Sequence, residues 1–397
     1  MHHWPILQEQ RVRRSLNLMQ THHGQPARVM AACTPLINAS RFGKVAFMGD
    51  MADAVEMTLP SDWPVVVTGA SGFVAQHVVR LLLDKGYTVR GTLRDAARES
   101  GLRASLELAG VNIERLEFFT ADLTRDAGWR EALEGAKFVF HIASPVPQRP
   151  PRHDSELVLP ARDGTLRVLR AAHELGIRRV VMTSSISAIV QGHPRDGSKV
   201  FTEADWSIVD DKIPAYDKSK TLAERAAWDF VMSLPDAQRL ELVTINPGFI
   251  LGPSLDHDHG VSNELVRKMI RRDVPGLPDL HFPLVHVLDV AELHWRAMCT
   301  PSAAGQRFCC ALPLLSLPEI GEILAQAGYR VSRRKLPNWT VRVVGLFDRQ
   351  VAVILPELGK RDDFDCSRAK QILGWQPRTA QSAVLDAASS LQRHGLA

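Results

Sequence analysis

The most informative absences in this sequence concern charge and long apolar runs. The 397 residues carry a net charge of only +4, and the basic residues form no stripe of the kind that binds nucleic acid. No apolar run approaches the roughly 18 consecutive residues that a membrane-spanning helix requires. We therefore expect neither nucleic acid nor a membrane as a partner.

Cysteine is also scarce, and its spacing excludes a thiolate metal centre. The chain holds five cysteines, an odd number, with none of the paired spacings of zinc sites. We interpret them as reduced thiols, two of which are adjacent within an apolar run that reads as a strand. We therefore predict no metal and a cytoplasmic location. The five are Cys33, Cys299, Cys309, Cys310 and Cys366.

The remaining composition is that of an ordinary globular protein, with 45% hydrophobic and 23% charged residues. Residues 1–60 differ from the rest of the chain, because before residue 51 their only acids are Glu9 and Asp50 and no apolar period is sustained. We predict that they form a poorly ordered extension, and that a chain starting at Met57 folds and stays active. A transit peptide is the alternative.

A strand that turns at glycines into a helix organises the rest of the chain. Three valines, Val65–Val67, predict a buried strand, and Phe73–Leu83 has one apolar stripe at helical period. Between them Gly69 allows a tight turn and Gly72 lets a phosphate approach the backbone, while small Ala75 lets the helix pack closely. The N–H groups and the positive end of such a helix suit a pyrophosphate.

From residue 63 onward, strand patterns alternate with helix patterns, which is typical of a parallel sheet with helices on both faces. The fold class that we predict is α/β, a doubly wound parallel sheet with a smaller C-terminal lobe over its carboxyl edge. The expected strands cover 65–67, 88–93, 115–119, 137–142, 179–183, 240–245 and 306–312. The expected helices cover 73–83, 159–175, 216–232, 263–272, 318–327 and 380–392; another helix starts within 284–290, and 191–213 is an irregular loop.

The end of the second strand carries the residue that selects the cofactor. In many nicotinamide-binding folds an acidic side chain at this place binds the ribose 2′-hydroxyl. Here the place holds Arg94, with Arg90 earlier on the same face of the strand. Because a guanidinium fits a 2′-phosphate, the sequence favours NADP(H), with NAD as the alternative.

Tyr216 and Lys220 lie at the start of the helix that follows the fifth strand. Their i, i+4 spacing places the phenol and the ammonium on one face. A nearby ammonium favours the phenolate and would lower the pKa of Tyr216, which makes this tyrosine a candidate general acid near neutral pH. Their position downstream of Thr183-Ser184-Ser185 argues against a chance spacing.

Several motifs as a set resemble the extended short-chain dehydrogenase/reductases of the NAD-dependent epimerase/dehydratase family. They are Gly69-x-x-Gly72-x-x-Ala75, Asp122-Leu123, Thr183-Ser-Ser185, Tyr216-x-x-x-Lys220 and Asn246-Pro-Gly-Phe-Ile-Leu-Gly-Pro253. Within this family the chain is similar to the dihydroflavonol reductase-like group, which includes plant cinnamoyl-CoA reductases. Residues 73–77, 143–145 and 221–228 look closest to the microbial NADPH-dependent carbonyl reductases. The resemblance covers about residues 63–395.

The resemblance implies a role for each matching position. Tyr216 would give a proton to a carbonyl oxygen, and Lys220 would hold the nicotinamide ribose and tune Tyr216. Ser185 would hydrogen-bond the carbonyl oxygen, with Ser184 as the alternative, and Arg94 would bind the 2′-phosphate. The further cofactor contacts that it implies are Gly69, Ser71, Gly72, Phe73, Val74, Asp122, Leu123, Ala143, Ser144, Pro247, Gly248 and Ile250.

Two positions depart from the plant dihydroflavonol reductases. Val190 stands five positions after Ser185, where those enzymes place an asparagine that reads substrate hydroxyls, and Gly101 replaces their second basic residue. An apolar residue cannot make the asparagine's contact, which argues against a flavonoid substrate. The candidate pocket residues Val146, Val190, Phe249 and Phe282 suit a hydrophobic aldehyde or ketone.

The sequence thus predicts an NADPH-dependent carbonyl reductase, acting on a small hydrophobic substrate as a monomer or homodimer. Residues 61–253, with 285–312 returning to them, would form a Rossmann domain that binds NADP(H), and residues 254–284 and 313–397 the substrate-binding lobe. An NAD-dependent sugar epimerase/dehydratase or hydroxysteroid-type dehydrogenase is the same-fold alternative, against which Arg94 argues. An NADP-sensing regulator without turnover is the other, against which Tyr216 and Lys220 argue.

Overall fold

The computed structural model describes residues 63–146, 151–210 and 212–397. The predicted extension at residues 1–60, with Met57, lies outside the described residues. In the described part, every helix is too short or too polar to cross a membrane. No group of three or more His, Cys, Asp or Glu side chains among those residues is placed to hold a metal ion.

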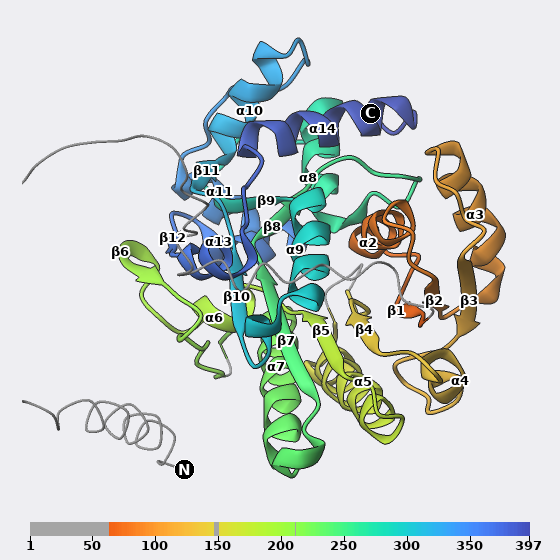
Figure 1. Ribbon diagram of the computed structural model, residues 1–397. Helices are drawn as coiled ribbons and strands as arrows, with labels where there is room; N and C mark the ends of the chain where they lie inside the picture. The colour runs from red at the N-terminus through yellow and green to blue at the C-terminus, as the bar shows by residue number, and fades with distance from the viewer. Residues whose placement is uncertain (1–62, 147–150, 211) are drawn as a thin grey trace, which may run out of the picture. The chain divides into compact units, whose positions relative to one another are not determined.

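A seven-stranded sheet forms the centre of the described chain (Figure 1). Its order is β10-β7-β5-β4-β1-β2-β3, and every pairing is parallel. The chain order reverses between β1 and β4, which is the topological switch point where open α/β sheets bind ligands. The strands are β1 (Val65–Val67), β2 (Val89–Leu93), β3 (Leu116–Thr120), β4 (Phe138–His141), β5 (Arg179–Thr183), β7 (Glu241–Pro247) and β10 (Arg307–Cys310).

Helices cover both faces of this sheet, as the doubly wound prediction requires (Figure 1). One hydrophobic cluster joins the sheet to α2 (Phe73–Asp84), α3 (Glu99–Leu108) and α9 (Val287–Cys299). A second cluster on the other face joins it to α4 (Trp129–Leu133), α5 (Ser155–Glu174) and α7 (Ala215–Ser233). Strands buried on both faces explain the unbroken apolar runs such as Val65–Val67.

A third hydrophobic cluster lies toward the C-terminus and draws on residues 251–391. It packs α8 (Gly260–Arg271), α10 (Leu317–Gln326) and α14 (Ala380–Arg393) against a small sheet of order β11-β9-β8. The strands of this sheet are β8 (Phe249–Leu251), β9 (His281–His286) and β11 (Leu314–Ser316). The predicted boundaries between a cofactor domain and a substrate lobe stay a prediction.

The other elements are shorter. They are α6 (Ser187–Val190), α11 (Asn338–Gly345), α12 (Arg349–Ile354) and α13 (Ser367–Leu373), the strands β6 (Asp196–Phe201) and β12 (Arg361–Phe364), and the 3₁₀ turns η1 (Ala96–Arg98), η2 (Asp236–Gln238), η3 (Pro301–Ala303) and η4 (Leu355–Glu357). All remaining expected strands and helices are present within a few residues of their predicted bounds.

Two expectations about secondary structure are wrong. Residues 284–286 belong to strand β9, and helix α9 starts only at Val287, because parallel pairing with β8 holds these residues extended. Residues 191–213 are not wholly irregular, since they contain β6, which pairs with β12. The partner of β6 lies about 160 residues further along the chain, so no local pattern indicates it.

Candidate active site

The carboxyl edge of the main sheet gathers nearly all the predicted site residues. Parallel strands all end at the same edge of the sheet, and most of the predicted site residues come directly after the end of one of these strands. Residues 69–74 follow β1, Arg94 follows β2, Asp122 and Leu123 follow β3, Ala143 and Ser144 follow β4, Ser185 follows β5, Pro247 ends β7, Gly248 follows it, and Ile250 lies in β8. Tyr216 and Lys220 come from the first turns of α7.

The glycine turn after β1 has the geometry that the motif predicts. Gly69 adopts φ +65°, and a Cβ added there would lie 3.0 Å from the Cβ of Ala143. The N–H of Gly72 donates to the carbonyl of Gly69 over 2.9 Å, and Gly72 is the N-cap of α2 without a side-chain cap. The first N–H groups of α2 are therefore left for a ligand, and a phosphate fits them.

Thr68 ties the two strands of the switch point together. Its hydroxyl accepts the N–H groups of Ile142 and Ala143 over 3.0 and 2.9 Å and shares a hydrogen bond with Nδ1 of His141 over 3.1 Å. The other ring nitrogen of His141 meets the hydroxyl of Thr165. Burial, aided by the charge of Lys220, lowers the pKa of His141 to about 3, so the imidazole is neutral. These buried groups position Ala143, and the sequence motifs did not point to them.

Arg94 is exposed and lines a cavity of about 270 Å³ together with Asp122 and Arg125. Hydrogen bonds from Thr124, and then the charge of Arg94, hold the pKa of Asp122 below its usual value. Arg94 makes no ion pair with any described residue, so its guanidinium can accept a 2′-phosphate. Arg125 is a second cation in the same cavity that sequence reasoning missed.

The side chain of Arg90 is engaged in other interactions. Its guanidinium pairs with Glu117 over 3.3 Å and donates to the carbonyl oxygen of Glu134 over 2.6 Å. It also lies over the ring of Phe119. Although Arg90 lies on the same face of the strand as Arg94, its hydrogen bonds are made to the neighbouring strand and to the end of α4.

The two adjacent serines after β5 have different surroundings. Ser184 is buried, and its hydroxyl donates to the carboxylate of Glu224 over 2.5 Å. The hydroxyl of Ser185 accepts the N–H of Ser187 over 3.1 Å and lies near enough to the phenol of Tyr216 to lower its pKa. Of the two, Ser185 is the one that meets the predicted proton donor.

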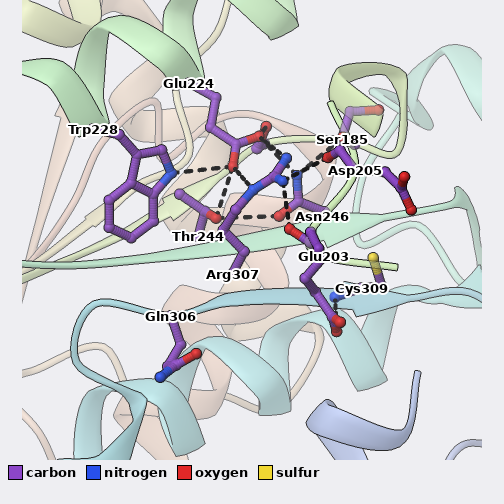
Figure 2. Close-up of polar contacts among 12 residues, drawn as sticks. Ser185, Glu203, Asp205, Glu224, Trp228, Thr244, Asn246, Gln306, Arg307 and Cys309 are labelled. Carbon is purple, nitrogen blue, oxygen red and sulfur yellow. Dashed lines mark hydrogen bonds and ion pairs between the residues drawn. The ribbon is translucent and has the colours of Figure 1, made fainter. Parts of the chain in front are cut away.

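A buried polar network centred on Glu224 backs the serine turn (Figure 2). Besides Ser184, the Glu224 carboxylate accepts the side-chain N–H of Asn246 over 2.8 Å and the hydroxyl of Thr244 over 3.0 Å. Asn246 also donates to the carbonyl oxygen of Ser185 over 3.1 Å, so the network holds the backbone of the turn itself.

Arg307 supplies the positive charge in this network. Its guanidinium donates to Glu224 over 2.7 Å and to the carbonyl oxygens of Glu203 and Asp205, and it stacks 3.7 Å from the centre of the Trp206 ring. Burial by itself would raise the pKa of Glu224, but Arg307 and the other hydrogen-bond donors outweigh burial and lower it. The carboxylate is therefore charged and fully hydrogen-bonded.

The expectation that the pKa of Tyr216 is lowered is wrong. Burial, aided by the charge of Asp217, raises the pKa of Tyr216 to about 12, and the hydrogen bond with Ser185 opposes this only in part. Lys220 lies one turn away but directs its ammonium toward the carbonyl of Thr183, 3.5 Å distant. The phenol therefore keeps its proton at neutral pH, as a proton donor must.

Lys220 is itself perturbed. Burial lowers its pKa to about 8, while the charge of Glu224, one turn further along α7, opposes this shift. The ammonium is therefore still mostly charged at pH 7. Glu224 thus acts on both sides of the site, because it holds Ser184 by a hydrogen bond and Lys220 by its charge.

The four apolar pocket candidates do not form one group. Phe249 and Phe282 lie together, with ring centres 4.8 Å apart. Val190 is buried in the main hydrophobic cluster, whereas Val146 is exposed. A larger cavity of about 530 Å³ lies at the opposite edge, where residues 173–178 and 238–241 line it. None of the predicted site residues reaches that edge.

The motifs and this geometry agree with a comparison against known families. The chain belongs to the NAD dependent epimerase/dehydratase family, because the sequence model of this family matches residues 65–311. This confirms the predicted extended short-chain dehydrogenase/reductase family.

Named relatives narrow the resemblance to reductases. Over 269 residues the chain is 37% identical to the cinnamoyl-CoA reductase CAD2 of Medicago truncatula, which covers 66% of this chain and 80% of the relative. It is 31% identical over 287 residues to an anthocyanidin reductase of Vitis vinifera, covering 68% of this chain and 82% of the relative.

Solved structures give the same result. Yeast methylglyoxal/isovaleraldehyde reductase Gre2, complexed with NADPH, superposes with a TM-score of 0.70 at 25% identity, covering 84% of this chain and all of that one. The Candida albicans Gre2 complex with NADPH also has a TM-score of 0.70, at 26% identity, covering 84% of this chain and 99% of that one. The predicted Rossmann-type fold and the predicted class, an NADP-dependent oxidoreductase, are confirmed by these relatives.

Proposed function

We propose that this protein is an NADPH-dependent reductase that transfers a hydride to the carbonyl group of a hydrophobic aldehyde or ketone, with Tyr216 as the proton donor. The observation that carries the proposal is the convergence of Ser185, directly after β5, with Tyr216 and Lys220, in the first turns of α7, at the carboxyl edge of the sheet, where Ser185 acts on the pKa of the Tyr216 phenol. A carbonyl oxygen placed against this pair meets two hydroxyl groups.

The residues present fit NADPH. The Gly69–Gly72 turn and the start of α2 would hold the pyrophosphate, and Arg94 would hold the 2′-phosphate. Asp122 and Leu123 would flank the adenine, and Ala143 and Ser144 would line the ribose. Phe73 and Val74 lie in the first turn of α2, while Pro247, Gly248 and Ile250 would run beside the nicotinamide. When bound, NADPH supplies the hydride.

The chain's own residues would manage the proton and the charge. Tyr216 would donate its proton to the carbonyl oxygen as negative charge develops there, and Ser185 would donate a hydrogen bond to the same oxygen. The Lys220 ammonium would stabilise the phenolate that Tyr216 leaves behind. With a pKa raised to about 12, Tyr216 would then recover a proton readily from the solvent.

The proposed substrate class is based on the apolar pocket candidates and on the substrates for which the relatives are named. Phe249 and Phe282 offer apolar rings, and Val190 cannot hydrogen-bond a substrate hydroxyl. Among the relatives, Gre2 is named for methylglyoxal and isovaleraldehyde and CAD2 for cinnamoyl-CoA. All three compounds contain a carbonyl carbon that accepts hydride, so a small aldehyde or ketone is the substrate class that we favour.

The test is a screen of the full chain for oxidation of NADPH and of NADH against aliphatic, aromatic and α-dicarbonyl compounds. We expect turnover of at least one aldehyde, with NADPH preferred about tenfold or more, because the phosphate contact is a charged hydrogen bond. NADPH binding without turnover of any carbonyl would favour a regulator. Equal use of both cofactors, with conversion of a nucleotide sugar, would favour an epimerase.

A further inference from the structure

Residues 329–347 form a surface segment, which we call the basic apolar segment, far along the chain from the proposed catalytic residues. The segment contains no aspartate or glutamate, and it holds five of the chain's cations. The whole chain has a net charge of only +4, so this short segment alone exceeds it. Its cations are Arg330, Arg333, Arg334, Lys335 and Arg342.

Helix α11, within this segment, turns its apolar stripe toward the solvent. Trp339 and Val343 lie at i, i+4 on one face of the helix and are 67% and 48% exposed, and Leu346 and Phe347, which directly follow the helix, are 77% and 87% exposed. The opposite side of the helix carries Val341, which is only 4% exposed. An amphipathic helix usually buries such a stripe against its own core, so this one is available to a partner.

The segment is held firmly in this orientation. The N–H of Leu277 donates to the carbonyl of Arg334 over 2.7 Å, and the N–H of Leu336 donates back to Leu277 over 2.9 Å. At the end of α11, a Cβ added to Gly345 would lie 2.7 Å from Leu355, which shows how closely that side packs. Rotating the stripe inward would break these contacts, so both the extended stretch that carries most of the cations and α11 are fixed to the rest of the fold.

Most of the cations keep their charge toward the solvent. Arg333 lies 3.7 Å from Glu322, with both side chains well exposed, and Lys335 lies near enough to Glu319 to lower its pKa. Arg330, Arg334 and Arg342 make no ion pair with any described residue. The segment therefore carries a net positive charge beside its exposed apolar side chains, and its partner is expected to be anionic and apolar at once.

We propose that the basic apolar segment docks on the surface of an anionic phospholipid bilayer. Trp339, Leu346 and Phe347 would enter the boundary between headgroups and acyl chains, and the cations would meet the lipid phosphates and carboxylates. Trp and Phe beside Lys and Arg are the composition of helices that lie in this boundary. This proposal departs from the expectation of no membrane partner, which rested on the lack of a run long enough to span a bilayer.

A second copy of the chain fits the same surface less well. A two-fold dimer through this face would bring the segment against itself, so five positive charges would oppose five others. Like charges across an interface disfavour association. An anionic bilayer instead satisfies both the apolar stripe and the charge.

The test is sedimentation of the full chain with vesicles of phosphatidylcholine plus phosphatidylserine, compared with phosphatidylcholine alone. We expect partitioning only to the anionic vesicles and its loss at high salt. Arg334→Glu should lower partitioning about tenfold or more, and the double variant Trp339→Ser, Phe347→Ser should abolish it. The matched controls are Arg130→Glu and Leu108→Ser, which change an exposed cation and an exposed apolar residue elsewhere and should leave partitioning unchanged.

Two results would overturn the proposal. One is equal partitioning of wild type and the segment variants, or none of the wild type even at low salt. The other is a dimer in solution that the double variant dissociates, since that would make a second copy the occupant. NADPH-dependent turnover, or NADPH binding if turnover is absent, shows in each case that the variants are folded.

Discussion

The charged side chains at the two ends of the main sheet's carboxyl edge differ in burial and in ion pairing. At the end formed by β2 and β3, Arg94 and Arg125 face a cavity, and Arg94 has no ion-pair partner among the described residues. At the end formed by β5, β7 and β10, Glu224 and Arg307 are both buried and satisfy each other, and Ser184 and Asn246 complete the carboxylate's hydrogen bonds.

The difference follows from where each charge lies. A buried charge is costly unless it is paired and hydrogen-bonded, so the end with Glu224 and Arg307 must be complete before any ligand binds. An exposed arginine costs little when unpaired, because water solvates it. In the function that we propose, the end with Arg94 would therefore keep its charge for the cofactor, and the end with Glu224 would be preorganised, as electrostatic stabilisation of a reacting oxygen requires.

The largest effect is expected from a variant that tests whether Tyr216 is the proton donor. Tyr216→Phe keeps the ring but removes the hydroxyl, so kcat should fall by ~10²–10⁴-fold, while NADPH affinity changes only a few-fold. Steady-state reduction of an aldehyde and NADPH fluorescence measure the two effects. Tyr329→Phe is the matched control and should be neutral. Retention of more than about a tenth of kcat, with chemistry rate-limiting, would contradict the assignment.

The second prediction tests the preorganised network through Glu224→Gln. This variant leaves Arg307 buried without its counter-charge, so the free energy of unfolding measured in urea should fall by about 3–5 kcal/mol. Glu292→Gln, which breaks a partly exposed i, i+4 pair with Arg296, should cost only about 0.3–0.5 kcal/mol. Equal losses in the two variants would mean that burial gives the Glu224 pair no special weight.

The same variant should also change the pH dependence of turnover. The charge of Glu224 raises the pKa of Lys220 against the effect of burial, which leaves it at about 8. Removing that charge should lower the pKa further, and the alkaline limb of kcat/KM, where Lys220 loses its proton, should move to lower pH. A limb that stays in place or moves upward would show that another group sets it.

The third prediction separates the two serines. Ser185→Ala removes a hydrogen bond to the reacting oxygen, so kcat should fall by ~10²-fold with little loss of stability. Ser184→Ala leaves Glu224 short of one donor, so unfolding should become easier by about 1–3 kcal/mol, with a smaller effect on kcat. Steady-state kinetics and urea unfolding, measured on both variants, test this prediction. A larger loss of kcat in Ser184→Ala than in Ser185→Ala would assign the catalytic role to Ser184.

The smallest expected effect concerns the adenosine end. Arg94→Ala should weaken NADPH binding by about 1.5–3 kcal/mol, the usual strength of a hydrogen bond to a charged group, and leave NADH binding unchanged. Arg90→Ala should change neither, because Arg90 is engaged with Glu117 and Glu134. Titration of both cofactors by fluorescence gives the comparison. Equal weakening of NADH and NADPH would place Arg94 outside the phosphate site.

Much of the fold could be predicted because its signals are local. The Val65–Val67 strand, the glycine turn and the apolar stripe of α2 lie within about 20 residues, and the i, i+4 spacing of Tyr216 and Lys220 needs only one helix. The parallel order of the strands then followed from their alternation with helices. The candidate site residues could be proposed for the same reason, since each one follows a predicted strand or opens a predicted helix.

Tertiary structure alone decided what depends on distant partners and on burial. Glu224 meets Arg307, and β6 meets β12, only after the chain has folded back over 83 and about 160 residues respectively. The raised pKa of Tyr216 comes from desolvation, which no spacing rule encodes. The sequence by itself thus determined which side chains reach the sheet's edge, because local periodicity sets element and face. Packing determined their charge states and partners, because these depend on the groups that exclude water around them.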